Sequence, residues 1–164
     1  MTREPTFLPD AWLIELGRVV QAWISFETMF DLMLQKLAGY NDPLDPTFTI
    51  LTAHSSFPQR LDMLKSLCVR HMDSHPHLSN YKDVARAVSE AQRLRNFFMH
   101  NLIGAESDGA ITVSIVSARG QLKFEIRPIE LGEISNAVDR IMDAGRQVYR
   151  LVVNSDPSSN RAAT

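Results

Sequence analysis

The strongest constraint on the fold is a long helical pattern that covers residues 10–39. No proline lies between Asp10 and Gly39, and apolar residues recur at steps of three and four. This spacing is typical of an amphipathic helix with one buried face. We expect Asp10 to cap the helix start and Gly39 to stop it. The predicted buried stripe consists of Leu13, Leu16, Val20, Trp23, Phe30, Leu34 and Leu37.

The same helical spacing returns in several later segments. After a turn-rich loop at 40–46, residues 47–53 predict a short helix. Pro58 fits the first turn of the next helix, which ends near residues 71–73. Two longer helices are predicted over 78–103 and 131–153. The expected core stripe of the 78–103 helix is Val84, Ala87, Val88, Ala91, Leu94, Phe98 and Leu102.

Between the last two predicted helices, the spacing of apolar residues changes from every third or fourth residue to every second residue. Residues 111–115 and 122–126 alternate apolar and polar side chains on either side of residues 118–120, which predicts a β-hairpin. The expected fold is therefore mainly α: a helical bundle of about four to five helices, with the hairpin between the last two. Residues 154–164 are rich in Ser, Asn, Pro and Ala, and we expect a disordered tail there.

Composition limits the classes of function. A length of 164 residues fits one domain, and 45% hydrophobic with 22% charged residues is usual for a globular protein. A net charge of -2 argues against a general nucleic-acid coat protein, and DNA is not an expected partner. The single cysteine, Cys68, rules out an internal disulfide and is expected to be a buried, inert thiol. The amino-terminal residues lack an export pattern and no apolar run spans a bilayer, so we expect a cytoplasmic protein without membrane contact.

Chemistry-bearing side chains gather late in the 78–103 helix, in the hexapeptide Arg95-Asn96-Phe97-Phe98-Met99-His100. Asn96 and His100 lie about 40° apart around a helix, and the long side chain of Arg95 can reach the same face. An imidazole can take a proton from a hydroxyl or give one to a leaving oxygen. A guanidinium can hold a phosphate and stabilise its extra charge in the transition state. These are the parts needed for metal-free RNA cleavage, in which a 2′-hydroxyl attacks the neighbouring phosphate.

This hexapeptide resembles the motif of the HEPN superfamily: an arginine, a polar residue that is often Asn, a short spacer and a histidine. The order of the predicted elements is also similar, and the likeness makes residues 1–153 a single HEPN-like helical domain. The resemblance implies a helical bundle that dimerises, with the two motif helices facing each other across a cleft. It also implies a metal-independent endoribonuclease without a cofactor, often a toxin or a defence effector, so an antitoxin protein is an expected partner. By this likeness His100 is the acid and base, Arg95 the phosphate contact and Asn96 the orienting residue.

A second hypothesis belongs to another class of function. Some HEPN relatives bind a nucleotide or only assemble, without cleaving RNA. The chain would then be a non-catalytic helical module that binds a nucleotide or a partner protein and keeps the motif for structure.

Other residues are candidates for binding. Glu27 interrupts the apolar stripe of the 10–39 helix, and an unpaired carboxylate on a buried face is costly. It either reaches water at the helix edge or forms an ion pair with Arg95. Arg86 and Arg93 precede the motif and could line an RNA path with Lys123 and Arg127, or they could form an ordinary solvated face.

Three histidines lie close together in the segment 71–77. They could suggest a metal site, but Pro76 breaks the helical spacing and no second ligand cluster follows. We therefore expect a solvated connector between helices and no metal site.

Overall fold

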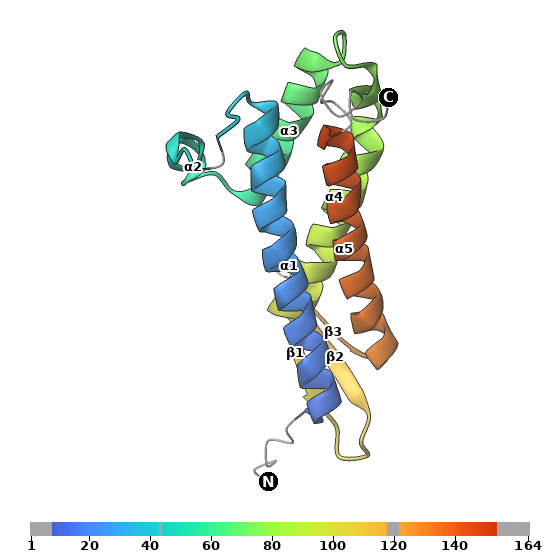
Figure 1. Ribbon diagram of the computed structural model, residues 1–164. Helices are drawn as coiled ribbons and strands as arrows, with labels where there is room; N and C mark the ends of the chain where they lie inside the picture. The colour runs from blue at the N-terminus through green and yellow to red at the C-terminus, as the bar shows by residue number, and fades with distance from the viewer. Residues whose placement is uncertain (1–7, 43, 118–121, 154–164) are drawn as a thin grey trace, which may run out of the picture.

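The computed structural model describes residues 8–42, 44–117 and 122–153 and is mainly α-helical (Figure 1). A small sheet follows the fourth α-helix, so the predicted bundle with a hairpin before the last helix is confirmed. The predicted tail at 154–164 lies outside the described residues. In chain order the elements are α1 (Asp10–Leu37), α2 (Thr47–Thr52), α3 (Phe57–His71), η1 (Pro76–Asn80), α4 (Tyr81–His100), β1 (Leu102–Ala105), β2 (Ile111–Ser117), β3 (Lys123–Pro128) and α5 (Leu131–Val153).

Helix α1 forms the long axis of the molecule. Its cap position is Pro9, and Asp10 makes no side-chain capping bond, so the prediction that Asp10 caps the helix is wrong. Proline has no N–H and a fixed φ, and it therefore fits next to a helix start, while Asp10 places its charge at the positive end of the helix dipole. The stop at Gly39 is confirmed, because its φ of 90° is one that glycine adopts without strain.

The buried face of α1 is rotated from the prediction in its first half. Leu13 and Val20, which we expected in the core, are 51% and 42% exposed. Val19 and Ala22 are buried instead, on a helix that packs against both α5 and α4. The buried residues of this helix are Val19, Ala22, Trp23, Phe26, Phe30, Leu34, Gln35 and Leu37.

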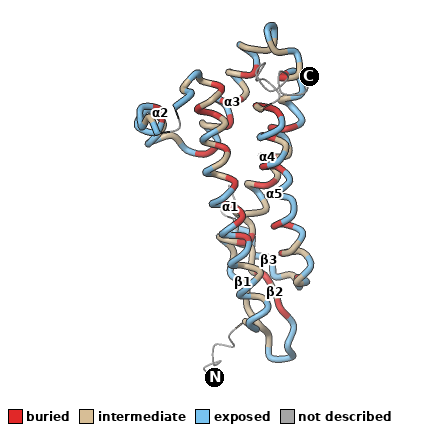
Figure 2. Tube along the Cα trace, in the orientation of Figure 1, coloured by how far each residue is buried: buried red, intermediate tan, exposed pale blue. Residues whose placement is uncertain are grey.

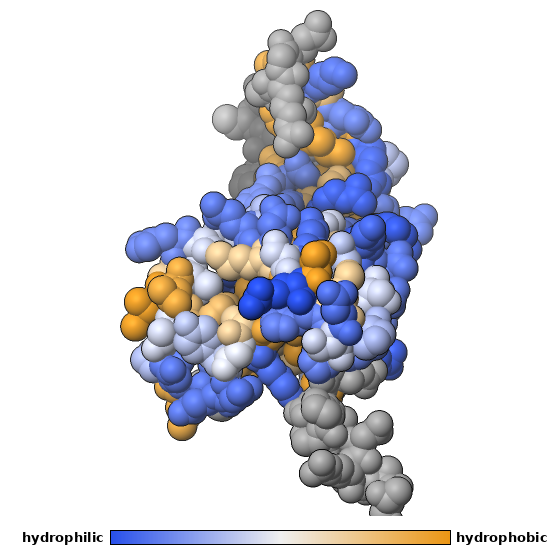
Figure 3. All heavy atoms as spheres, turned by 90° about the horizontal axis from the view of Figure 1, so that it is seen from above, coloured by the Kyte–Doolittle hydropathy of each residue, from blue (hydrophilic) through white to orange (hydrophobic). Residues whose placement is uncertain are grey.

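Helix α3 completes the upper part of the bundle in Figure 1, and the short α2 lies to its side. The α3 start carries a capping box, in which the Gln59 side chain accepts from the Ser56 backbone N–H at 2.7 Å. Helix α3 packs on the upper part of α1. Helix α2 projects sideways with only Phe48 buried, and hydrophobic atoms gather over it at the left edge of Figure 3.

Helix α4 ends at His100, three residues before the predicted end at Ile103. Asn101 has extended backbone, and its side-chain Nδ2 donates to the Phe97 carbonyl at 2.9 Å, which satisfies a group at the helix end. The next residues form β1, a strand that helical periodicity did not reveal. Leu102 and Ile103 continue the apolar spacing of the helix, but their pairing with β2 makes this segment a strand.

The three strands form an antiparallel sheet in the order β1-β2-β3. One face carries Ile111 and Val113, which pack with Ile129 beneath Trp12 and Phe97. The register pairs Val116 with Phe124 on the other face, which is open to solvent. The exposed apolar side chains of this outer face are Leu102, Val116, Phe124 and Ile126.

Helix α5 has the predicted bounds and packs along both α1 and α4 (Figure 1). Buried residues follow the interior of the three long helices and become sparse toward the sheet (Figure 2). Within the described residues, none of the helices combines the length and the apolar character that crossing a bilayer requires.

Candidate functional site

The last two turns of α4 bring Arg95, Asn96 and His100 together. Arg95 Nη1 donates to Asn96 Oδ1 at 2.9 Å and lies 3.1 Å from His100 Nε2. A guanidinium can only donate, so a hydrogen bond at this distance requires an unprotonated Nε2 and places the ring proton on Nδ1. The geometry thus presents the imidazole lone pair next to a permanent cation.

An aromatic ring from α1 supports the guanidinium. Arg95 Cζ lies 5.7 Å from the centre of the Trp23 ring, within the range of a cation–π contact. Trp23 is itself buried and packs against Phe26 and Phe57 with ring centres 5.1 and 4.9 Å away. The guanidinium of Arg95 therefore lies against a ring of the core, while His100 is exposed.

Glu27 does not pair with Arg95, and that predicted ion pair is wrong. Glu27 accepts from Arg60 Nη2 of α3, and Arg60 Nη1 lies 2.6 and 2.5 Å from the two Asp31 oxygens. Glu27 lies one turn beyond Trp23 on α1, beside the first turn of α3. Arg60 of that turn is therefore its partner. This cluster of two carboxylates and one guanidinium fixes α3 on α1.

Arg86 and Arg93 lie on the outer face of α4 and are exposed. Seven residues separate Arg93 from His100, which places both on one face of the helix about 10 Å apart along its axis. Arg86 pairs with Asp83 at 3.0 Å, and no described hydrogen bond or ion pair links either arginine to the Arg95 cluster. They extend the positive face away from His100 and do not form part of its contacts.

Arg127, another candidate for an RNA path, contacts two other elements of the fold. Its guanidinium lies 5.2 Å from the Phe97 ring centre and 3.0 Å from Glu133 Oε2 of α5. The hydrogen bond that Arg127 donates lowers the pKa of Glu133. Burial raises this pKa, but by a smaller amount. Arg127 thus ties the sheet and α5 to the motif helix.

The histidine-rich connector lies at the opposite end of α4 from His100. The His75 and His77 rings are 6.0 Å apart. Burial lowers the pKa of His77, and the charge of the neighbouring His75 lowers it further. In the described part of the chain, no three His, Cys, Asp or Glu residues are arranged to hold a metal ion.

Sequence reasoning missed one contributor to the site, Trp23, and one residue that fixes the helices beside it, Arg60. Trp23 was assigned to the core, yet one face of its ring carries Arg95. Arg60 was not considered, although its spacing from Phe57 puts the two on one face of α3, and its guanidinium lies 5.5 Å from the Phe57 ring centre. Both depend on how α1 and α3 meet, which spacing within one helix does not reveal.

Comparisons with protein-family models, with curated proteins and with solved structures give no match for this chain.

Proposed function

We propose that this chain is a metal-independent endoribonuclease of HEPN type, acting as a dimer with paired Arg95/His100 sites. The observation that carries the proposal is the 3.1 Å approach of Arg95 Nη1 to His100 Nε2 at an exposed helix end. Proton transfer and anion binding need these two groups side by side.

In the proposed reaction, His100 Nε2 takes the proton of an RNA 2′-hydroxyl. The 2′-oxygen attacks the adjacent phosphorus, and the bond from phosphorus to the 5′-oxygen breaks. His100 of the second copy, which starts this step protonated on both ring nitrogens and without the Arg95 contact, gives a proton to the leaving 5′-oxygen. The products are a 2′,3′-cyclic phosphate and a free 5′-hydroxyl, and every proton taken is returned.

Arg95 would hold the phosphate during this step. Its guanidinium now contacts Asn96 and His100, and a phosphate oxygen would replace these contacts with a charge-assisted bond. Trp23 keeps the guanidinium carbon in place while the partners change. Asn96 is free to orient the imidazole or the scissile phosphate. Arg93, exposed on the same face of α4 as His100, would attract the adjoining RNA backbone.

An uncovered stripe on α1 supports the dimer. We call the residues Leu13, Gly17, Val20 and Ile24 the α1 stripe; they recur at steps of four, three and four. The three apolar side chains are about half exposed, and a Cβ placed on Gly17 would meet nothing within 4 Å. Such spacing with a small residue suits the close approach of another helix. Val20 and Ile24 flank Trp23, so a second copy seated here would lie next to Arg95. An antitoxin protein would be a further partner of the dimer.

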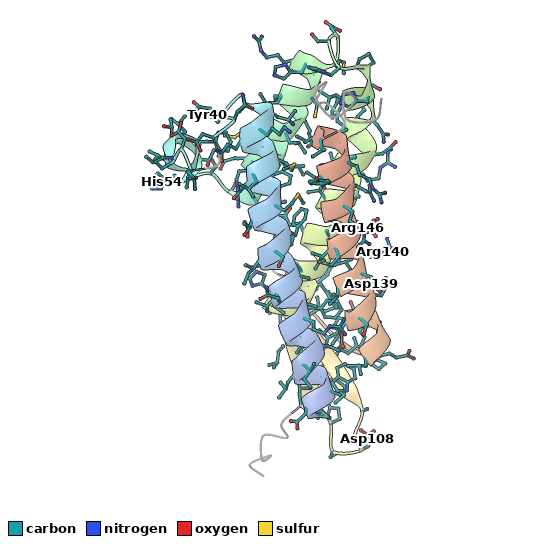
Figure 4. The ribbon with its side chains drawn as sticks, viewed as in Figure 1. Tyr40, His54, Asp108, Asp139, Arg140 and Arg146 are labelled. Atoms are coloured by element: carbon teal, nitrogen blue, oxygen red, sulfur yellow. The ribbon has the colours of Figure 1, made fainter. Side chains whose placement is uncertain are left out.

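The test is RNA cleavage by His100→Ala and by Arg95→Ala. Each variant should lose at least about 100-fold in rate, because positioned acid–base groups contribute that much. His54→Ala is the matched control, since His54 is exposed and projects from the α2 region far from the motif (Figure 4). Wild-type activity should persist in excess EDTA. Full cleavage by the His100 variant would contradict the assignment.

The alternative proposal is a non-catalytic module that binds a nucleotide or a partner protein. Two contacts of Arg95 favour this alternative. Its guanidinium donates to Asn96 and lies over the Trp23 ring, as expected for an arginine that stabilises the fold. Under this proposal the wild-type protein cleaves no RNA, and Arg95→Ala lowers its unfolding temperature.

A further inference from the structure

A groove of about 330 Å³ opens between α1 and α5. Ser25, Phe26 and Met29 line it from α1, and Met142 and Tyr149 are among its residues on α5. None of its lining residues belongs to the Arg95 cluster, so it is a separate feature. Its volume lies at the lower end of the range usual for small-molecule sites.

At the floor of the groove, α5 carries a glycine where it packs against α1. A Cβ on Gly145 would lie 3.3 Å from Met29 Cε and 3.4 Å from Phe26 Cδ2. Met29 and Phe26 therefore already fill the space beside Gly145, and the glycine lets α5 lie close to α1. The buried Phe26 and Ile141 form the apolar floor of the groove. Met142 and Tyr149 form one wall and are 43% and 50% exposed, which is a large apolar surface to leave in water.

The rim of the groove is positively charged. Arg146 and Arg150 line it from α5 (Arg146 is labelled in Figure 4). Arg146 Nη2 lies 3.4 Å from Asp143, and both side chains are more than half exposed, so this pair holds the arginine weakly. Arg150 has no hydrogen bond or ion pair with any described residue. An anionic group above the apolar floor would meet two guanidinium groups.

The length of the groove favours a small ligand over a partner helix. Its α5 residues run from Ile141 to Arg150, a rise of about 14 Å. Toward the start of α5 a polar cluster follows: Ser135 donates to Glu15 at 3.1 Å, and Arg18 donates to Glu15 at 2.7 Å. A helix several turns long would have to cover this polar cluster, whereas a short apolar chain would not reach it.

We propose that the α1/α5 groove binds a small amphiphilic carboxylate, with its apolar chain over Phe26, Met29 and Met142 and its carboxylate between Arg146 and Arg150. The site does not depend on the proposed RNA cleavage. Apolar burial supplies affinity, and the two arginines select the anionic head.

The experiment is a titration of the full chain with decanoate and with decanol, followed by the methyl signals of methionines labelled with ¹³C. Decanoate should shift Met29 and Met142, whereas Met63, on α3 and outside the groove, should stay unchanged. Ser25→Trp should remove binding by filling the groove from an exposed position. The double variant Arg146→Gln/Arg150→Gln should bind decanoate about tenfold more weakly and decanol as the wild type does.

Arg140→Gln is the matched control, because Arg140 is also on α5 but pairs with Glu90 away from the groove. It should bind decanoate as the wild type does. The proposal is overturned if decanoate leaves Met29 and Met142 unshifted, or if decanol binds the wild type as tightly as decanoate. It is equally overturned if Ser25→Trp leaves decanoate binding intact. Loss of a dimer in Ser25→Trp without any decanoate binding by the wild type would make the groove a subunit contact instead.

Discussion

At the scale of single residues, two arginines beside the aromatic core of α1 and α3 have different partners. Arg95 contacts the Trp23 ring from α4 and points its donors toward the exposed helix end. Arg60 lies over the Phe57 ring from α3 and binds the two carboxylates of α1. Arg95 thus contacts polar groups at the exposed end of α4, whereas Arg60 joins α3 to α1.

The Arg60 cluster gives a first prediction on stability. Arg60→Met should lower the free energy of unfolding by about 2 kcal/mol, because it leaves Glu27 and Asp31 without their shared cation while water still reaches both carboxylates. Glu27→Gln should cost about 1 kcal/mol, since Asp31 still neutralises Arg60. Urea denaturation measures both values. Equal costs for the two variants would contradict the assignment of Arg60 as the shared partner.

The single thiol gives a second prediction. Cys68 is fully buried, and burial raises its pKa to about 11. The reactive thiolate is therefore scarce at pH 8, and iodoacetamide should modify the folded protein at a rate set by unfolding. Mass spectrometry should show rapid modification only in denaturant. Rapid modification of the native protein would mean that Cys68 is reached by solvent.

At the scale of elements, the joint between β3 and α5 holds the sheet in place beside the motif helix. Arg127 of β3 contacts Phe97 of α4 and Glu133 in the first turn of α5. This single residue connects three elements, so the position of the sheet depends on it.

The Arg127–Glu133 pair predicts a dependence of stability on pH. Its hydrogen bond lowers the pKa of Glu133 in the folded state, so the stabilisation is present at neutral pH and is lost as pH falls through the folded pKa, below the usual glutamate value of about 4.3. The gain is about 0.5 kcal/mol, because both side chains are more than one-third exposed. Unfolding of wild type and Glu133→Gln should differ at pH 7 and converge below pH 4. A constant difference across this range would exclude the pair as its cause.

The elements that were predictable are those whose pattern is local. The spacing of apolar residues gave α5 its bounds, and the alternation after residue 110 gave the hairpin. Strand β1 was missed because Leu102 and Ile103 continue a helical stripe, and only pairing with β2 makes them a strand. Likewise Arg95, Asn96 and His100 were predictable neighbours on one helix, whereas Trp23 and Arg60 depend on packing between helices.

At the scale of the whole molecule, apolar surface remains uncovered in several places. The α1 stripe, the outer face of the sheet and the projecting α2 all expose large aliphatic side chains. Contiguous apolar patches on a folded chain commonly mark contacts with other molecules. The α1 stripe is the patch that adjoins the Arg95 cluster, through Trp23.

The proposed dimer is tested by Val20→Glu. A carboxylate in the centre of the α1 stripe should weaken association at least about tenfold, since it would be buried without a partner. Sedimentation at micromolar concentration should show dimers for the wild type and monomers for the variant. Val69→Glu is the control, because Val69 is half exposed on α3, outside the α1 stripe. A wild-type monomer, or equal effects of the two variants, would remove this interface.

His100 is the last helical residue, and two residues later the chain is already paired in a strand. A synthetic peptide copying α4 would fray at this end and leave the imidazole without a defined position. Minimal versions of the site must therefore keep the strands as well as the helix. Shortening the loop between β1 and β2 would therefore disturb the strand pairing that fixes the helix end carrying His100.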